Sequence, residues 1–162
     1  MANPSDALVA ELLRGRYVAS LATENADGSI HMVAVWFAHH EKHLYVATSS
    51  RSRKARNISA KPKASLMIDV RGAEGRGVTA SGFARVIGGQ RSRELNARIY
   101  DRYLSSEAMA DPRVGPVFAQ WNDVTIEIAP SSWISWDVRV ADREVFGGAF
   151  ASSPDYMLPR QL

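Results

Sequence analysis

The sequence contains no cysteine among its 162 residues. Disulfide bonds, thiolate metal sites and a cysteine nucleophile are therefore excluded. The start of the chain lacks a basic segment followed by an apolar stretch, and no apolar run approaches the roughly 20 residues of a membrane span. We therefore expect a cytoplasmic protein that has no membrane partner.

Internal repeats and long linkers are also missing, and the length is typical of one domain. We expect a single domain over residues 1–150, followed by a loose tail over residues 151–162. The formal net charge is only +3. Because this excess is small, any attraction for an anionic partner must come from how the cations are placed.

Short apolar and β-branched runs separated by turns predict a mostly β protein with some α structure. The first three expected strands should form an antiparallel meander through two tight turns, the first at the Asp27-Gly28 step. The last two should be separate strands interrupted at Pro130. The expected strands are residues 17–23, 30–38, 44–48, 64–70, 78–87, 124–128 and 133–138. Together they predict an antiparallel β-barrel with helices at its ends.

Three helices are expected from their caps and apolar spacing. The first covers residues 7–13, with Ser5 or Asp6 as its cap and Gly15 as its stop. The second covers residues 52–59, and the third covers about 91–104. We expect residues 111–116 to be a loop.

The expected helix over residues 52–59 begins within a cluster of cations, which are unfavourable at a helix N-terminus. No carboxylate occurs in residues 43–68, so a distant acid, solvent or a bound anion must offset their charge. Hydroxyl groups, free backbone N–H groups, a guanidinium and an amine are the usual ligands of a phosphate. The cations are Arg51, Arg53, Lys54 and Arg56.

Two other interpretations of this cluster are open. A run of charge is most often a solvated helix face. Basic residues also bind nucleic acid, but the stretch between Tyr45 and Phe83 contains no aromatic residue on which a base could stack. We therefore expect no nucleic-acid partner.

Three segments in order carry a resemblance to a known family: LATENADGSIHMVAVWF (21–37), LYVATSSRSRKARNISAKPKASLMID (44–69) and VTASGFARV (78–86). Together they resemble the split-barrel flavin and deazaflavin oxidoreductases related to pyridoxamine 5'-phosphate oxidase. The resemblance implies an antiparallel split β-barrel of six to seven strands with short helices. It also implies a homodimer with two cofactor sites at the interface, each closed by C-terminal residues of the partner.

The resemblance implies where a cofactor would bind, either FMN or coenzyme F420. One segment would line the ring, and Thr48 would meet the ribityl chain or the ring edge. Ser52, Arg53 and Lys54 match the phosphate clamp, and Asn57 matches an asparagine that follows it in many relatives. The ring-lining residues are Val33, Ala34, Val35 and Trp36, and Trp133, Trp136 and Arg139 are candidates for closing the partner's site.

The implied function is hydride transfer to or from a small organic substrate, for which no catalytic side chain is assigned. Flavin chemistry occurs on the ring, so it requires few protein groups. The ending WISWDVRVADREVFGGAF lacks the final signature that holds the pyridoxine substrate, so we do not expect vitamin B6 oxidation. The alternative is a non-catalytic carrier of flavin, F420 or haem on the same barrel.

A metal site is not expected. His39, His40 and His43 are closely spaced, but neighbouring residues of an extended chain point to opposite faces. We interpret them as an exposed hairpin tip.

Overall fold

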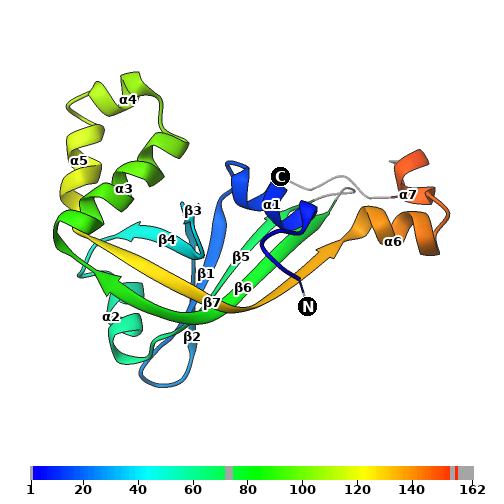
Figure 1. The fold of residues 1–162 in the computed structure, drawn as a ribbon, viewed down its shortest axis with the longest axis horizontal. Helices are drawn as coiled ribbons and strands as arrows, with labels where there is room; N and C mark the ends of the chain where they lie inside the picture. Colours follow the sequence, from blue (N-terminus) through cyan, green and yellow to red (C-terminus); the bar gives the residue numbers. More distant parts are fainter. Residues whose placement is uncertain (1, 72–74, 154–155, 157–162) are drawn as a thin grey trace.

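The structure is a computed structural model that describes residues 2–71, 75–153 and 156. Within these residues the strands form one seven-stranded antiparallel sheet in the order β2-β1-β5-β6-β7-β4-β3, which curls into a half-barrel (Figure 1). This confirms the predicted fold class. Most of the tail predicted for residues 151–162 lies outside the described residues.

The strands have the following bounds: β1 Ala19–Glu24, β2 Ile30–Val35, β3 Ala38–His40, β4 His43–Thr48, β5 Lys63–Val70, β6 Arg76–Ile87 and β7 Val124–Asp137.

The chain crosses between the two edges of the sheet at Trp36 and Phe37. These two residues alone separate β2, at one edge, from β3, at the other. The predicted continuous strand 30–38 and the predicted meander are therefore wrong. At this bend the Phe37 side chain is fully buried in the core. Strand β4 pairs with β7, so among the described strands β2 pairs only with β1. Residues 30–38 are apolar on both sides of the bend, so their composition did not reveal where β2 ends and β3 begins.

The core lies inside the curl. Alternate residues of the strands point inward, as in β1, where every second residue is buried. Helix α1 (Ala7–Arg14) closes one end of this core by burying Val9, Leu12 and Leu13. On the opposite face of the sheet, large apolar side chains remain exposed.

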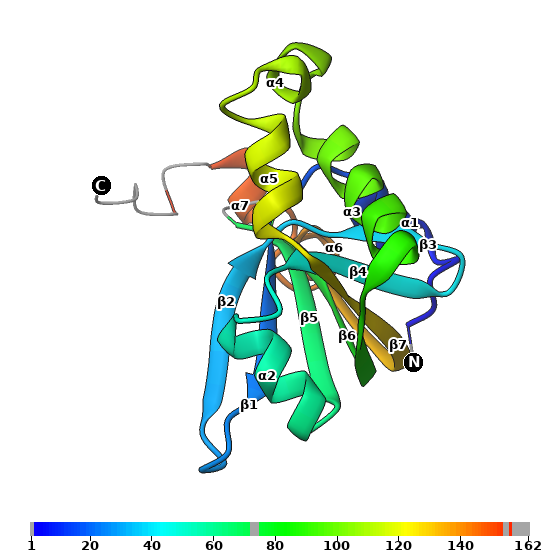
Figure 2. The same cartoon turned by 90° about the vertical axis from the view of Figure 1, so that its left-hand side faces the viewer.

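Three predicted helices are confirmed with ends within two residues of the prediction: α1, α2 (Arg53–Ala60) and α3 (Gly89–Tyr103). Two short helices follow α3, and α5 begins inside the predicted loop 111–116. Figures 1 and 2 show α3, α4 and α5 grouped above α2 at one end of the sheet. The helices not predicted are α4 (Ser106–Ala110), α5 (Gly115–Trp121), α6 (Val138–Val145) and α7 (Ala149–Ser152).

Strand β7 runs through Pro130 without a break, contrary to the predicted interruption. Ser81 pairs with Ser132 and Gly82 pairs with Pro130, so Ser131 is an extra residue on β7. This β-bulge accommodates the proline, which cannot donate a hydrogen bond to the ladder. The partner residue must be glycine, because a Cβ at Gly82 would lie 2.1 Å from the Ala129 carbonyl oxygen.

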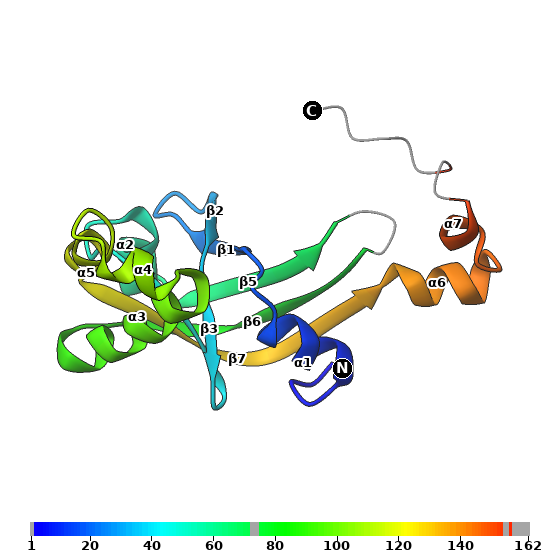
Figure 3. The same ribbon diagram turned by 90° about the horizontal axis from the view of Figure 1, so that it is seen from above.

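Helices α6 and α7 extend from the end of β7, away from the sheet (Figure 3). Asp142 in α6 is buried and accepts hydrogen bonds from the backbone N–H groups of Phe150 and Ala151, both at 3.0 Å. This carboxylate therefore holds α7 against α6. None of the helices in the described ranges is both long and apolar enough to span a lipid bilayer.

Candidate functional site

The cation cluster lies on a short loop between β4 and α2. The Oγ of Ser52 accepts a hydrogen bond from the Ala55 N–H at 3.2 Å, which confirms the predicted N-cap. The Thr48 hydroxyl, at the buried end of β4, donates to the same Ser52 Oγ at 3.0 Å. The start of the helix is thus joined to the strand that precedes it.

The acid missing from the local sequence comes from the start of β7. Asp123 accepts hydrogen bonds from the Ser50 N–H at 2.7 Å and from the Ser50 hydroxyl at 2.6 Å. These two bonds hold the pKa of Asp123 below its ordinary value, and the charge of Arg51 adds to the effect. A distant acid therefore offsets part of the charge of the cluster, at Arg51.

Lys54 has a different environment, because it enters a cavity of about 300 Å³ beside α5. Its side chain is half-buried, and burial lowers the pKa of its amine below the ordinary value of 10.5. Among the described residues no carboxylate forms an ion pair with this amine. A half-buried cation without an acid favours an anionic ligand. The cavity is lined by Val18, Ala34, Val35, Trp36, Ala47, Lys54, Phe118 and Asn122.

A second cavity of about 360 Å³ adjoins the first on the outer face of the sheet. The two share Val18 and Ala34 in their walls. An ion pair between Asp69 and Arg71, at 2.9 Å, lies at the far side of the second cavity. The two cavities therefore lie side by side, with apolar side chains in their shared wall and the charged groups Lys54, Asp69 and Arg71 in their other walls, a combination expected of a ligand site.

Three of the four predicted ring-lining residues, Ala34, Val35 and Trp36, share the first cavity with Lys54. Val33 instead packs against the core, and Arg53 is exposed in the first turn of α2. Four wall residues were not predicted: Val18, Ala47, Phe118 and Asn122. No local pattern marks them: Phe118 lies in, and Asn122 directly follows, a helix that the sequence did not indicate.

Trp36 is held rigidly in an aromatic stack. Its ring lies 5.0 Å from that of Tyr103 at an interplanar angle of 4°, and 5.5 Å from that of Phe118 at 19°. Parallel aromatic rings at these distances attract one another. The wall of the cavity formed by Trp36 and Phe118 is therefore fixed in place by α3 and α5.

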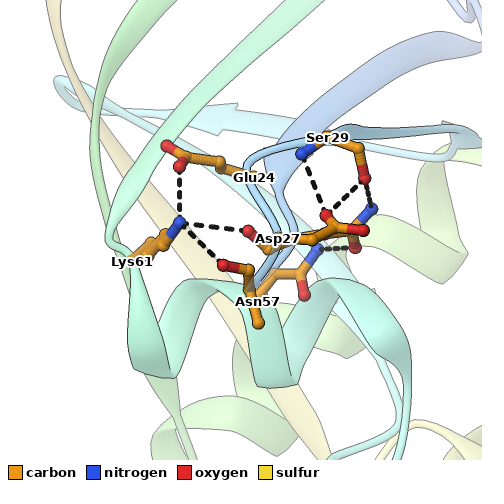
Figure 4. A network of polar contacts seen from close by, with 7 residues as sticks. Glu24, Asp27, Ser29, Asn57 and Lys61 are labelled. Atoms are coloured by element: carbon orange, nitrogen blue, oxygen red, sulfur yellow. Dashed lines mark hydrogen bonds and ion pairs between the residues drawn. The ribbon is translucent and has the colours of Figure 1, made fainter.

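Asn57 points toward the β1–β2 hairpin (Figure 4) and is not one of the residues that line this cavity. Its amide nitrogen donates to Thr23 Oγ1 at 3.1 Å and to Asn25 Oδ1 at 2.9 Å. Lys61 lies on the same side, where its amine binds Glu24 at 2.6 Å. The structure therefore separates Asn57, which ties α2 to the hairpin, from Lys54, which faces the cavity.

The aromatic and basic C-terminal candidates lie elsewhere. Trp136 is on β7, and its ring covers Gly77 so closely that a Cβ there would lie 2.1 Å from it. The register places Trp136 across from Gly77 and Asp69, on the outer face of the sheet. Trp133 packs in the core, and Arg139 pairs with Asp137 at 2.7 Å. The structure places none of these three side chains in the Lys54 cavity.

The half-barrel fold and the loop between β4 and α2 define a class of protein, the split-barrel proteins related to pyridoxamine 5'-phosphate oxidase. Residues 5–133 match the family model described as pyridoxamine 5'-phosphate oxidase, and the chain belongs to that family. No curated protein matches the chain. Members of the family commonly form dimers; some bind FMN or F420, and others bind haem.

Solved structures share the fold. A conserved hypothetical protein from Mycobacterium tuberculosis, Rv2991, is similar with a TM-score of 0.70 and 25% identity, over 83% of this chain and 86% of that one. HutZ, the heme storage protein from Vibrio cholerae, is similar with a TM-score of 0.63 and 18% identity, over 78% and 90%. An F420 reductase is similar with a TM-score of 0.61 and 22% identity, over 76% and 94%.

Proposed function

We propose that this protein is an oxidoreductase that uses FMN or coenzyme F420 to transfer a hydride to or from a small organic molecule. The observation that carries the proposal is Lys54, a half-buried amine with no acid beside it among the described residues, next to a capped helix start. A phosphate would supply the missing negative charge.

The residues present fit such a cofactor. Lys54, the Ser52 hydroxyl and the exposed Arg53 would hold its phosphate, and Thr48 would position Ser52 through their hydrogen bond. Ala34 and Val35 would lie against the ring, beside the rigid Trp36. The bound ring would supply the redox chemistry, while these residues orient it and exclude water from one side.

A substrate other than a vitamin B6 phosphate is part of the proposal. Arg139, the basic candidate for closing the partner's site, is engaged by Asp137 through two hydrogen bonds of 2.9 and 2.7 Å. This pairing supports a different substrate, because the guanidinium already has an anionic partner.

The first test is a titration of the purified protein with FMN, FAD and F420, followed by absorption and fluorescence. We expect FMN or F420 to bind with a Kd of about 1 μM or lower, as the charge-assisted phosphate contacts require. Reduction of the bound cofactor by an electron donor, followed by reoxidation by a substrate, would distinguish an enzyme from a carrier. Binding of none of these compounds, or binding of haem alone, would contradict the proposal.

A homodimer formed through the outer face of the sheet completes the proposed site. Four large apolar side chains are 59–65% exposed on this face: Ile30, Met32, Phe83 and Ile134. An open hollow of about 320 Å³ lies between Ile30 and Phe83. Apolar patches of this kind mark interfaces, and the Lys54 cavity opens next to the same face through Val18 and Ala34.

We expect the paired change Met32→Lys and Phe83→Lys to convert a dimer into a folded monomer, because it would bury two amines in the interface. Light scattering after size exclusion measures the mass. Trp121→Lys is the control, since Trp121 is 71% exposed but lies on α5 and not on the sheet. A wild-type protein that is monomeric at micromolar concentration would refute the dimer.

A further inference from the structure

A buried polar network in α3 holds the junction between α5 and β7. The Asn96 amide nitrogen donates to the carbonyl oxygens of Asn122, at 2.9 Å, and of Val124, at 3.3 Å. Its amide oxygen accepts from the Thr125 hydroxyl at 2.7 Å, and that hydroxyl also lies 2.9 Å from the Ser92 hydroxyl. All three network side chains are at most 3% exposed. Because a satisfied buried network is rigid, the backbone on both sides of Asp123 is fixed.

The Asp123 side chain, held between these fixed backbone positions, hydrogen-bonds to the loop over residues 49–52. Its two carboxylate oxygens are both used there, one by the Ser50 N–H and the other by the Ser50 hydroxyl. Hydrogen bonds to a carboxylate are short and about twice as strong as neutral ones. The other bonds of the loop are local in sequence. The Ser52 N–H donates to the Ser49 carbonyl at 2.9 Å, and the Arg51 N–H donates to the Ser49 hydroxyl at 3.2 Å. The Thr48 hydroxyl donates to the Ser52 Oγ, and the Arg56 guanidinium donates to the Arg51 carbonyl.

The loop leads directly into the anion-binding end of α2. Ser52 and Lys54 follow Ser50 by two and four residues, whereas Asn122, next to Asp123, lines the Lys54 cavity. A displacement of Ser50 would therefore move the N-cap and the amine relative to the cavity wall. The same junction that forms the wall holds the loop.

We propose that Asp123 is a positioning residue for the anion site, acting through Ser50. It does not touch the anion, since an acid at that place would repel it. Its role is to hold the loop so that the Ser52 cap and the Lys54 amine, both at the start of α2, keep their places beside the cavity that Lys54 lines. The part of this inference that concerns affinity rests on the proposed cofactor function; the part that concerns the loop does not.

The test compares Asp123→Asn with Asp111→Asn in the full-length protein. Asp111 is a matched control, because it also accepts from a nearby backbone N–H, that of Arg113, but does so before α5 and away from the cavity. We expect Asp123→Asn to speed hydrogen exchange at the Ser50 amide about tenfold, because it replaces a charge-assisted bond with a weaker neutral one. The control should leave it unchanged.

The second measurement is cofactor affinity, with the same variants below their melting temperatures. We expect the Kd for FMN or F420 to rise about tenfold in Asp123→Asn. Ser50→Ala removes only the hydroxyl donor, so the Kd should rise less than in Asp123→Asn. The double variant should bind the cofactor no more weakly than Asp123→Asn alone, because both changes act on the same contact between Ser50 and Asp123. Ser50→Ala replaces Asp123→Asn if the latter does not fold.

The outcomes separate this inference from the proposed function. If the wild type binds neither cofactor, the function fails, and Ser50 exchange alone decides whether Asp123 holds the loop. Unchanged exchange in Asp123→Asn overturns the inference. Faster exchange with unchanged cofactor affinity also overturns it, because the loop would then not position the site.

Discussion

Lys54→Ala is expected to weaken cofactor binding by about 2 kcal/mol, or roughly 30-fold in Kd, because it removes a charged hydrogen-bond donor from the phosphate. The amine is half-buried and has no acid beside it among the described residues, so its positive charge is available to a ligand. Combining it with Arg53→Ala should weaken binding further. Fluorescence titration with FMN and with F420 measures both effects.

The control for this prediction is Lys42→Ala. Lys42 is exposed at the tip of the β3–β4 hairpin, where its removal should leave the Kd unchanged. Equal losses in Lys42→Ala and Lys54→Ala would show that the charge acts through long-range attraction only, which salt screens. The phosphate contact would then be refuted.

The pH dependence of cofactor affinity is a second test of Lys54. Burial lowers the pKa of Lys54, so its amine loses its proton at a lower pH than an ordinary lysine with a pKa of 10.5. Only the protonated amine attracts a phosphate, so affinity should fall as the pH rises toward 10.5. In Lys54→Arg the fall should disappear, because a guanidinium remains charged over this range.

Asn57→Ala is expected to destabilise the fold by about 2–3 kcal/mol while leaving cofactor affinity within about twofold. Asn57 is 9% exposed, and its amide nitrogen is the donor to Thr23, which is only 2% exposed. The change leaves a void and removes the two bonds that tie α2 to the β1–β2 hairpin. Urea unfolding measures the loss.

Two further variants sharpen this result. Ser59→Ala is the control on the same helix, because its exposed hydroxyl bonds only to the Ala55 carbonyl of the preceding turn. Asn57→Asp keeps the shape but replaces the donor with an acceptor that faces the Asn25 amide oxygen, so it should also destabilise the fold. A variant Asn57→Ala with normal stability and lost cofactor binding would assign this residue to the site instead.

The start of α2 shows where prediction from sequence succeeds. The cap at Ser52, the helix it begins and the absence of a nearby acid are local properties, which follow from residues three or four positions apart. The resemblance to a family then grouped Lys54 and Asn57 as cofactor ligands. The resemblance did not show that the two side chains point in different directions, because residues three positions apart are neighbours on a helix surface. Only the packing of α2 against β1 decides which of them meets the cavity.

Prediction from sequence was also limited for contacts between segments that lie far apart in the chain. The sequence by itself determined where most of the strand segments lie, how the chain enters α2 and which cations have no acid nearby in the sequence. Only the tertiary structure decided that the chain bends at Trp36, that β4 pairs with β7, and that Asp123 holds a loop 73 residues away. The physical reason is that apolar patterning specifies that a strand is buried but does not specify its neighbour. Those neighbours depend on how the whole sheet closes, and that closure brings Phe118 and Asn122 to the amine of Lys54.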